Sequence, residues 1–507
     1  MNQLEIPDIK AKITVTGKDF LWSGCRPAHS GGLYLTTGLH TYIGVDNIYK
    51  NQSAEGGNQV MGIFDAFKKK ENDEPASFVL GVEDRFALLN TKDIVVVGYV
   101  KGTVRVGAAV YVSNFSDDEE GEILLTTVLG IELEPGKRAD EAKDCHVGLK
   151  LECAADFPFR CGTVLYSRQA SVSDVHDAYV KALGNQMVFH RQIELTQDEL
   201  DRMSITDGAE MWRLYSWYRC KVLPTATDAD RAKDMQKIAK LAEAIVTKML
   251  SVSQIYCVYS KITGEPAMFS ETVDQKDGTY MCTPPDIWIL TKPYKDVIGA
   301  TFPAEKYEIR EIKNDQSNAI SDFFGSIFYM NGACGVRVVN SNTSISAEKI
   351  VEKPDFSNLP EINRPVMNPD LERWILLIAE LGHPDTPDKE LIYKLYFSFM
   401  SRELVKAKFL IPMKADNDMP SPDENGKVVI EKDTTIALAT IEGKHGRPAV
   451  RMFTDWKRLR QGMKGEGWNG FIQPIEGMIG SFDCAINLTE YDKAGCYIDE
   501  EMFRGFN

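Results

Sequence analysis

Phe78-Val-Leu-Gly-Val-Glu-Asp-Arg-Phe86 opens a stretch that extends to Leu165 and carries the most specific pattern of the chain. It continues with Ile94-Val-Val-Val-Gly-Tyr-Val100, Val147-Gly-Leu-Lys-Leu151 and Arg160-Cys-Gly-Thr-Val-Leu165. Short runs of valine, isoleucine and tyrosine, separated by glycine, asparagine and aspartate at spacings of roughly ten residues, are typical of a small closed β-barrel. We therefore predict a barrel over residues 76–168.

The order of these pieces resembles the β-barrel second domain of translation elongation factor Tu and its relatives. The shared features are an Asp-x-Phe strand at Asp84, a Gly-Leu-x-Leu strand at Gly148, and an Arg-Gly-x-Val-Leu strand into which Cys161 intrudes. The resemblance implies a fold, and in the elongation factor this barrel works beside a GTPase domain. The sequence contains no Gly-x-x-x-x-Gly-Lys-Ser/Thr loop to hold a triphosphate and magnesium. We therefore expect no GTPase domain and no GTP binding.

The size and charge of the chain limit its organisation and its partners. A length of 507 residues predicts three or four domains, because a domain usually has about 100–200 residues. The net charge of −16 disfavours nucleic-acid partners, apart from a contact between the barrel and the ribosome or tRNA. Lys457-Arg-Leu-Arg460 is the best candidate for a basic patch, and we interpret it as the solvated face of a helix.

The cysteines, the amino terminus and the apolar runs indicate the cellular compartment of the protein. The ten cysteines are scattered, with no Cys-x-x-Cys motif and no histidines at metal-binding spacing, so we predict free thiols and no metal site. The amino terminus lacks the basic and apolar pattern of a leader, and no run of eighteen apolar residues occurs. We expect a cytoplasmic protein without membrane contact.

Helix signals follow the barrel and then recur. Ser173 is predicted to cap a first helix, and Thr196 forms a capping box with Glu199 at the start of another. A long helix from Thr227 leads into a strand at residues 254–259, and a helix from Thr386 leads into a strand at 408–412.

Two strands in these halves correspond closely. Pro285–Thr291 and Pro448–Thr454 are both strands that are bounded by proline and threonine and that open a helix. This shared order indicates an internal repeat. We predict a multi-domain α+β chain with these parts: a small amino-terminal segment and linker (1–75), the barrel (76–168), a helical connector (169–227), a first α/β domain (228–356), a helical linker (357–386) and a second α/β domain (387–507).

The two halves resemble the SseB family, which is named for enhanced serine sensitivity. Phe409–Pro412 matches the family's Val/Ile-Pro strand, Pro448–Asp455 its Pro-x-Val-x-x-Phe-Thr strand, and Cys484–Leu488 its late Ile-Asn strand. The resemblance is good over residues 400–505 and looser over 250–355. It implies two SseB-like α/β domains in tandem, and it brings no reaction and no catalytic residues with it.

Two segments are candidate ligand contacts. Asn331, Gly332 and Gly335 form a turn whose backbone amides can converge on a small anion, and a plain hairpin is the alternative. Thr454, Asp455 and Trp456 lie at a strand-to-helix switch, where open α/β sheets bind ligands. The alternative role for Thr454 or Asp455 is that of a helix N-cap.

No group of residues reaches catalytic specificity. The sequence lacks a Gly-x-Ser-x-Gly elbow, a His-Glu-x-x-His helix and a dinucleotide fingerprint, so we expect no catalytic residue and no cofactor. His176, between two aspartates, is interpreted as a surface polar residue.

The leading hypothesis is a non-catalytic cytoplasmic protein of the SseB type that binds or regulates through protein or small-molecule recognition. One alternative is a translation-associated factor whose barrel contacts ribosome, tRNA or a GTPase. Another is an unrecognised enzyme or a modulator of serine or sulfur metabolism.

Overall fold

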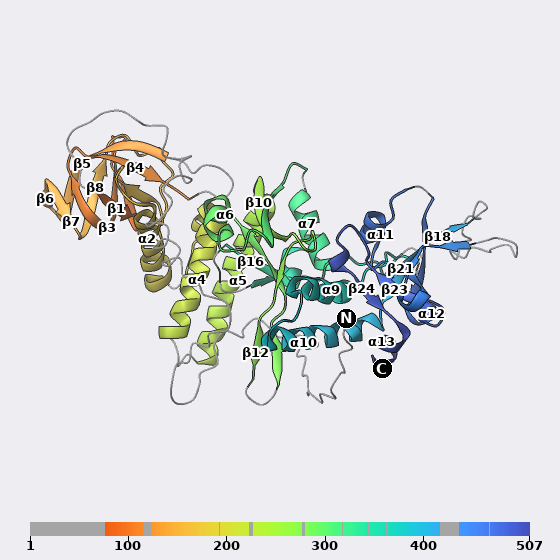
Figure 1. The fold of residues 1–507 in the computed structure, drawn as a ribbon. Helices are drawn as coiled ribbons and strands as arrows, with labels where there is room; N and C mark the ends of the chain where they lie inside the picture. The colour runs from red at the N-terminus through yellow and green to blue at the C-terminus, as the bar shows by residue number, and fades with distance from the viewer. Residues whose placement is uncertain are drawn as a thin grey trace.

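The structure is a computed structural model that describes residues 77–115, 123–191, 193–222, 227–275, 279–316, 318–339, 341, 344–360, 364–415, 436–465 and 467–506. The amino-terminal segment predicted over residues 1–75 lies outside the described residues. Figure 1 shows the barrel at one end of the molecule, a group of helices beside it, and then two sheets in succession along the chain.

The amino-terminal part is a closed β-barrel, as predicted, and it has six antiparallel strands. It closes because the first strand, β1, pairs with both β9 and β3. Alternate side chains along β3 are buried, among them Ile94, Val96, Val100 and Val104, and they fill the barrel interior. The strands follow the order β1 (Phe78–Gly81), β9 (Val164–Tyr166), β4 (Ala109–Ser113), β5 (Ile123–Glu134), β8 (His146–Leu151) and β3 (Ile94–Arg105).

Short strands and helices border the barrel. The strands are β2 (Asp84–Ala87), β6 (Lys137–Ala139) and β7 (Glu141–Lys143). The helices that follow are α2 (Val172–Leu183), a π-helical turn over Gly184–His190, α3 (Gln197–Arg202), α4 (Ile205–Val222) and α5 (Asp228–Ser251).

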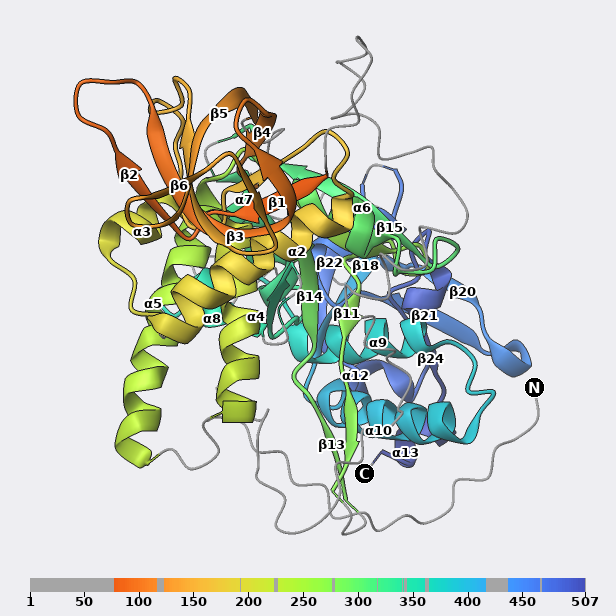
Figure 2. The ribbon, with the colours of Figure 1, turned by 90° about the vertical axis from the view of Figure 1, so that its left-hand side faces the viewer.

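The ends of these helices follow the capping signals with one exception. The predicted capping box of Thr196 and Glu199 forms at the start of α3. The Ser173 prediction is wrong, because Ser171 is the N-cap of α2 and its side chain accepts a hydrogen bond from the Asp174 amide at 3.1 Å. Helices α4 and α5 lie side by side and project away from the barrel (Figure 2).

The first sheet, here called the first unit, has the strand order β15-β10-β14-β16-β17. Only the central pair β14–β16 is parallel. A strand β11 (Met268–Phe269) also pairs with β14, and a hairpin of β12 (Thr272–Asp274) and β13 (Tyr280–Cys282) extends from the unit. The other elements are β10 (Gln254–Ser260), β14 (Asp286–Leu290), α6 (Lys292–Gly299), β15 (Tyr307–Lys313), α7 (Ala319–Tyr329), β16 (Gly335–Val338), β17 (Ser344–Ser346) and α8 (Ala347–Ile350).

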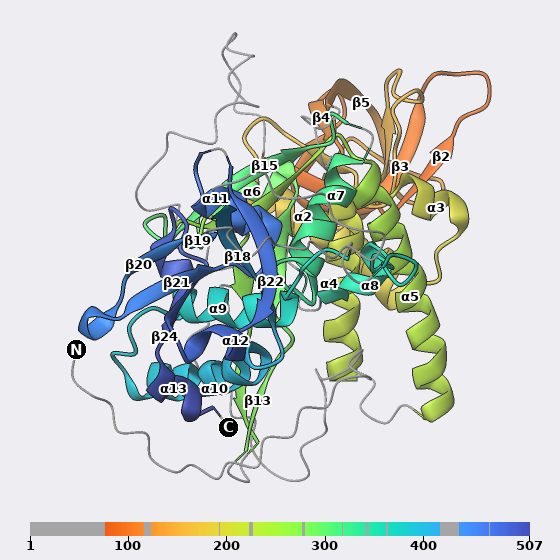
Figure 3. The ribbon, with the colours of Figure 1, turned by 90° about the vertical axis from the view of Figure 1, so that its right-hand side faces the viewer.

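The second unit begins with two packed helices, α9 and α10, and it has two sheets with the strand orders β19-β18-β22 and β20-β21-β23-β24. A bridge between Leu410 and Phe453 joins β18 to β21, and Figure 3 shows this unit nearest the viewer. Its elements are α9 (Pro369–Leu381), α10 (Pro387–Leu404), β18 (Lys408–Ala415), β19 (Ile436–Leu438), β20 (Thr440–Glu442), β21 (Pro448–Met452), α11 (Trp456–Gly462), β22 (Asn469–Pro474), α12 (Glu476–Ile479), β23 (Asp483–Ile486), β24 (Cys496–Ile498) and α13 (Glu500–Arg504).

With the Leu410–Phe453 bridge as the link between its two sheets, the second unit has the order β22-β18-β21-β23-β24, which corresponds to the order of the first unit. In both, a parallel central pair is flanked by antiparallel neighbours. Ile289 lies opposite Val338 in the first unit, and Met452 lies opposite Ile486 in the second. The next residues, Val339 and Asn487, have φ angles of 50° and 53°, and their amides donate to the carbonyls of Ile289 and Met452 at 2.7 and 2.9 Å.

The cysteines and the helices of the described residues were compared with the sequence predictions of free thiols and of no membrane span. The eight cysteines with described side chains are all free, and burial raises the pKa of Cys484 and of Cys496 to about 12. These two thiols therefore stay neutral near pH 7. Of the helices in the described part of the chain, none has the length and apolar character that are needed to span a bilayer.

Candidate functional site

The strand-to-helix switch of the second unit holds three of the predicted site residues. Thr454 and Asp455 are buried between β21 and α11. Asp455 is the N-cap of α11, because its side chain accepts a hydrogen bond from the Arg458 amide at 2.9 Å. Trp456 begins the helix and is 38 % exposed. The N-cap alternative is therefore confirmed for Asp455.

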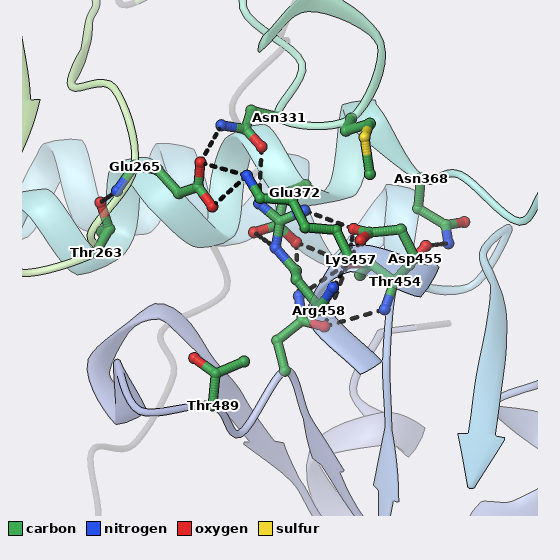
Figure 4. A network of polar contacts seen from close by, with 12 residues as sticks. Thr263, Glu265, Asn331, Asn368, Glu372, Thr454, Asp455, Lys457, Arg458 and Thr489 are labelled. Carbon is green, nitrogen blue, oxygen red and sulfur yellow. Dashed lines mark hydrogen bonds and ion pairs between the residues drawn. The ribbon is translucent and has the colours of Figure 1, made fainter. Parts of the chain in front are cut away.

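Arg458 forms the centre of a buried polar network that joins the two units (Figure 4). Its side chain is only 4 % exposed, and its guanidinium lies 2.5 Å from an Asp455 oxygen and 2.8 Å from Glu372 Oε1. It also donates to Asn331 Oδ1 at 2.9 Å. Since Asn331 follows α7 of the first unit and Glu372 lies on α9, one cation contacts three separate parts of the chain.

Lys457 makes a second connection between the units. Its ammonium lies 2.7 and 2.8 Å from the two carboxylate oxygens of Glu265 in the first unit. Glu265 also accepts a hydrogen bond from Asn331 Nδ2 at 3.0 Å. Asn331 thus donates to one carboxylate and accepts from Arg458, so the ion pairs of Lys457 and Arg458 belong to one network.

Glu372 is held by hydrogen bonds as well as by charge. Its Oε2 accepts from Thr454 Oγ1 at 3.0 Å and from Asn487 Nδ2 at 2.6 Å. Asn487 Oδ1 in turn accepts from the Thr454 amide at 3.0 Å. The left-handed conformation of Asn487 is tolerated by asparagine better than by most residues, and it turns the amide group toward the network.

The charges of the network are unequal in number. Three carboxylates, those of Glu265, Glu372 and Asp455, face two cations, those of Lys457 and Arg458. Burial raises the pKa of Glu372 to about 7, and repulsion from Asp455 adds to the rise although Arg458 opposes it. Burial alone would lower the pKa of Arg458, but the Glu372 and Asp455 carboxylates raise it above its usual value. Arg458 therefore stays charged, while the raised pKa of Glu372 allows its carboxyl group to bind a proton near neutral pH.

The predicted anion turn has a packing role in the structure. It connects α7 to β16, so the hairpin alternative is wrong. Gly332 has a φ angle of 81°, and an added Cβ would lie 2.0 Å from the Pro369 carbonyl oxygen at the start of α9. At Gly335 a Cβ would lie 2.4 Å from Ser344 Oγ. Both glycines allow a close approach of neighbouring segments, and a ligand-binding role for the turn stays a prediction.

The structure brings together only some of the predicted residues. Asn331, Thr454 and Asp455 meet in the network, while no hydrogen bond or ion pair joins the described Gly335 and Trp456 to it. The interpretation of Lys457 and Arg458 as a solvated helix face is wrong for Arg458, because the first unit and α9 cover it. Glu372 was not identified from the sequence. Glu372 lies on the same face of α9 as the apolar residues Ile375 and Leu376, and a charged residue on an apolar helix face is a sign in the sequence of a buried polar group.

A smaller network occupies the corresponding switch of the first unit. His176 is only 6 % exposed, so its interpretation as a surface residue is wrong. Its Nε2 lies 2.7 Å from the Tyr294 hydroxyl of α6, which donates to Glu210 of α4 at 2.9 Å. Thr291 and Thr206 contact each other through their hydroxyls at 2.7 Å. Each unit thus uses its strand-to-helix switch to dock on the segment that precedes it.

Part of the second unit is similar to a known family. Residues 398–470 match the model of the SseB protein N-terminal domain. This segment extends from α10 to β22 and includes Thr454, Asp455, Lys457 and Arg458. No curated protein matches the chain.

Proposed function

We propose that this protein is a non-catalytic binding or regulatory protein of the SseB type, with two SseB-like domains in tandem. The match over residues 398–470 supports this for the second unit, and the corresponding arrangement of strands around a parallel central pair supports it for the first. The domain limits predicted above, 228–356 and 387–507, remain part of this proposal.

The observation that carries the proposal is that the charged groups of the network form ion pairs with one another. Lys457, Arg458 and Asp455 all contact protein groups of opposite charge. A catalytic site needs a group that can reach the substrate, whereas a buried and paired network fixes geometry. The two units therefore act as one body, and recognition occurs on the outer surfaces that this body holds in place.

The test compares binding with turnover in a native cell extract. The full chain and its Lys457→Met variant are immobilised, and retained proteins and metabolites are quantified by mass spectrometry. Lys464→Met is the matched control, because Lys464 is exposed near the end of α11. We expect a retained partner or metabolite that is reduced by Lys457→Met and unchanged by Lys464→Met. Heat-sensitive consumption of a metabolite in proportion to the protein added would overturn the non-catalytic proposal.

A second candidate function is suggested by the barrel. Its closed six-stranded antiparallel form agrees with the resemblance to the elongation factor barrel, and it exposes apolar side chains at Phe86, Leu89 and Leu125. Such positions are suited to contact with a macromolecule. Cosedimentation of the full chain with ribosomes, reduced by Leu89→Ser, would move the translation-associated function ahead of the first proposal.

A further inference from the structure

A cavity of about 300 Å³ lies between the barrel and the helices that follow it. Its walls are the segment from Val82 to Arg85, the Arg160–Cys161 turn, the end of α2 with the π-helical turn, α3 and the first turns of α4. None of the polar network residues lines it. It is thus a separate site at a seam between two parts of the fold, where ligand pockets often occur.

Three of the four arginines of the cavity are already paired. Arg160 Nε lies 3.0 Å from Asp207 Oδ2. Arg191 forms a two-oxygen pair with Glu199, and Arg202 pairs with Asp198 one helical turn away. Their guanidinium groups hold the cavity wall in place.

Arg85 is different. Among the described residues its guanidinium forms no ion pair and no side-chain hydrogen bond, although the residue is half-buried at the cavity wall. Burial and the positive charge of the neighbouring Arg202 lower the pKa of Arg85, and Asp198 and Asp84 only partly offset this. A half-buried cation beside a second cation gains stability when an anion binds between them.

Part of the cavity lining is apolar. Leu183, Met187, Met203 and Met211 are all buried and line it, and methionine side chains adapt their shape to a bound apolar group. The thiol of Cys161 also lines the cavity, but it donates to the Ala182 carbonyl and burial raises its pKa. A neutral thiol is a weak nucleophile. Cys161 is therefore not an activated nucleophile, and the lining of the cavity is suited to binding.

We propose that the cavity binds a small monocarboxylate that carries an apolar chain. The carboxylate accepts hydrogen bonds from the Arg85 guanidinium, and the chain packs against the methionine wall. The lining contains five acidic residues against four arginines, so a dianion such as inorganic phosphate meets an excess of negative charge and is disfavoured. This inference goes beyond the proposed function, because it involves a different site and remains testable whether or not the inter-unit network supports recognition.

The test is calorimetric titration of the full chain with acetate, butyrate, hexanoate, octanoate and inorganic phosphate. We expect hexanoate or octanoate to bind more tightly than acetate, and phosphate to bind more weakly than either. Arg85→Gln should weaken binding by about ten- to a hundredfold, the effect of losing a charged hydrogen-bonding partner, and Arg85→Lys should recover part of the affinity. Arg105→Gln is the matched control, because Arg105 is a barrel arginine that is 64 % exposed and paired with Glu141.

Thermal unfolding without ligand separates binding from a structural role of Arg85. We expect the Tm of Arg85→Gln to equal or exceed that of the wild type, since the substitution removes the repulsion with Arg202. Absence of binding by every carboxylate, equal binding by Arg85→Gln, phosphate as the tightest ligand, or a large fall in Tm for Arg85→Gln would each overturn the proposal.

Discussion

Replacing Glu372 by glutamine changes the charge of the buried network and almost nothing of its shape. Glutamine keeps an oxygen that can accept from Thr454 and Asn487, as Glu372 Oε2 does. The substitution removes one of the two carboxylates that face Arg458 and leaves Asp455 at 2.5 Å. The variant therefore has the charge of protonated Glu372 at every pH, and its amide nitrogen takes the place of Oε1 beside Arg458 Nε.

The expected magnitude follows from the pKa of Glu372. This pKa is raised from 4.5 to about 7 by burial, so the folded state holds the proton more tightly than the unfolded state. The stability that this proton contributes is complete below pH 4.5 and is lost as the pH rises toward 7. At about 1.4 kcal/mol per pKa unit, the loss amounts to roughly 3 kcal/mol.

Urea unfolding of the wild type and of Glu372→Gln between pH 4 and pH 8 measures this effect. Relative to the wild type, the variant should gain about 3 kcal/mol of unfolding free energy between pH 4.5 and pH 8. The comparison with the wild type cancels the pH dependence of stability that comes from other groups. One such group is Asp286, because burial raises its pKa to about 6. Glu390→Gln is the control, because Glu390 forms an exposed pair with Lys394 whose contribution is about 0.5 kcal/mol or less. Parallel stability curves for the wild type and Glu372→Gln would refute the reasoning.

Other predictions test packing and independence of the parts. Ile289→Asp and Met452→Asp place a charge on fully buried central strands, and each should lower the unfolding free energy of its own unit by about 3–5 kcal/mol in urea titrations; unchanged midpoints would contradict the strand assignment. Gly264→Ala should lower the unfolding free energy by about 1–3 kcal/mol in thermal scans. Gly264 has a φ angle of 70°, and an added Cβ would lie 2.2 Å from the ring of Tyr491 in the second unit; an unchanged unfolding free energy would argue against that contact. Residues 76–168 alone should give a dispersed NMR spectrum, since one core cluster lies wholly within the barrel, and a collapsed spectrum would contradict its independence. Titration with GTP and magnesium should give no heat, and micromolar binding would contradict the sequence argument.

Local patterns sufficed to predict much of the fold. The run of β-branched residues from Ile94 indicates a strand, and capping residues such as Thr196 mark helix starts, because these signals depend on neighbours within a few residues. The correspondence of Pro285–Thr291 with Pro448–Thr454 is readable for the same reason. In the structure these two segments are central strands of the two units, with equivalent positions in the same strand order.

The network was only partly predictable. Thr454 and Asp455 were found because a strand-to-helix switch has a local pattern. Arg458 was misinterpreted because its burial depends on Glu372, which is distant in sequence, and on the first unit. His176 was misinterpreted in the same way, since its cover comes from Tyr294 on a helix far along the chain. Charges that a second unit buries look like surface charges until the tertiary arrangement is known.

The central claim is that the polar network fixes the two units as one body, and the coupling between Glu265 and Lys457 tests it most directly. These residues lie on different units, and their charged atoms are 2.7 Å apart. A double-mutant cycle with Glu265→Gln and Lys457→Met, measured by urea unfolding of the full chain, should give a coupling energy of about 1–3 kcal/mol. A coupling energy below about 0.5 kcal/mol, the additivity expected of independent sites, would contradict the claim.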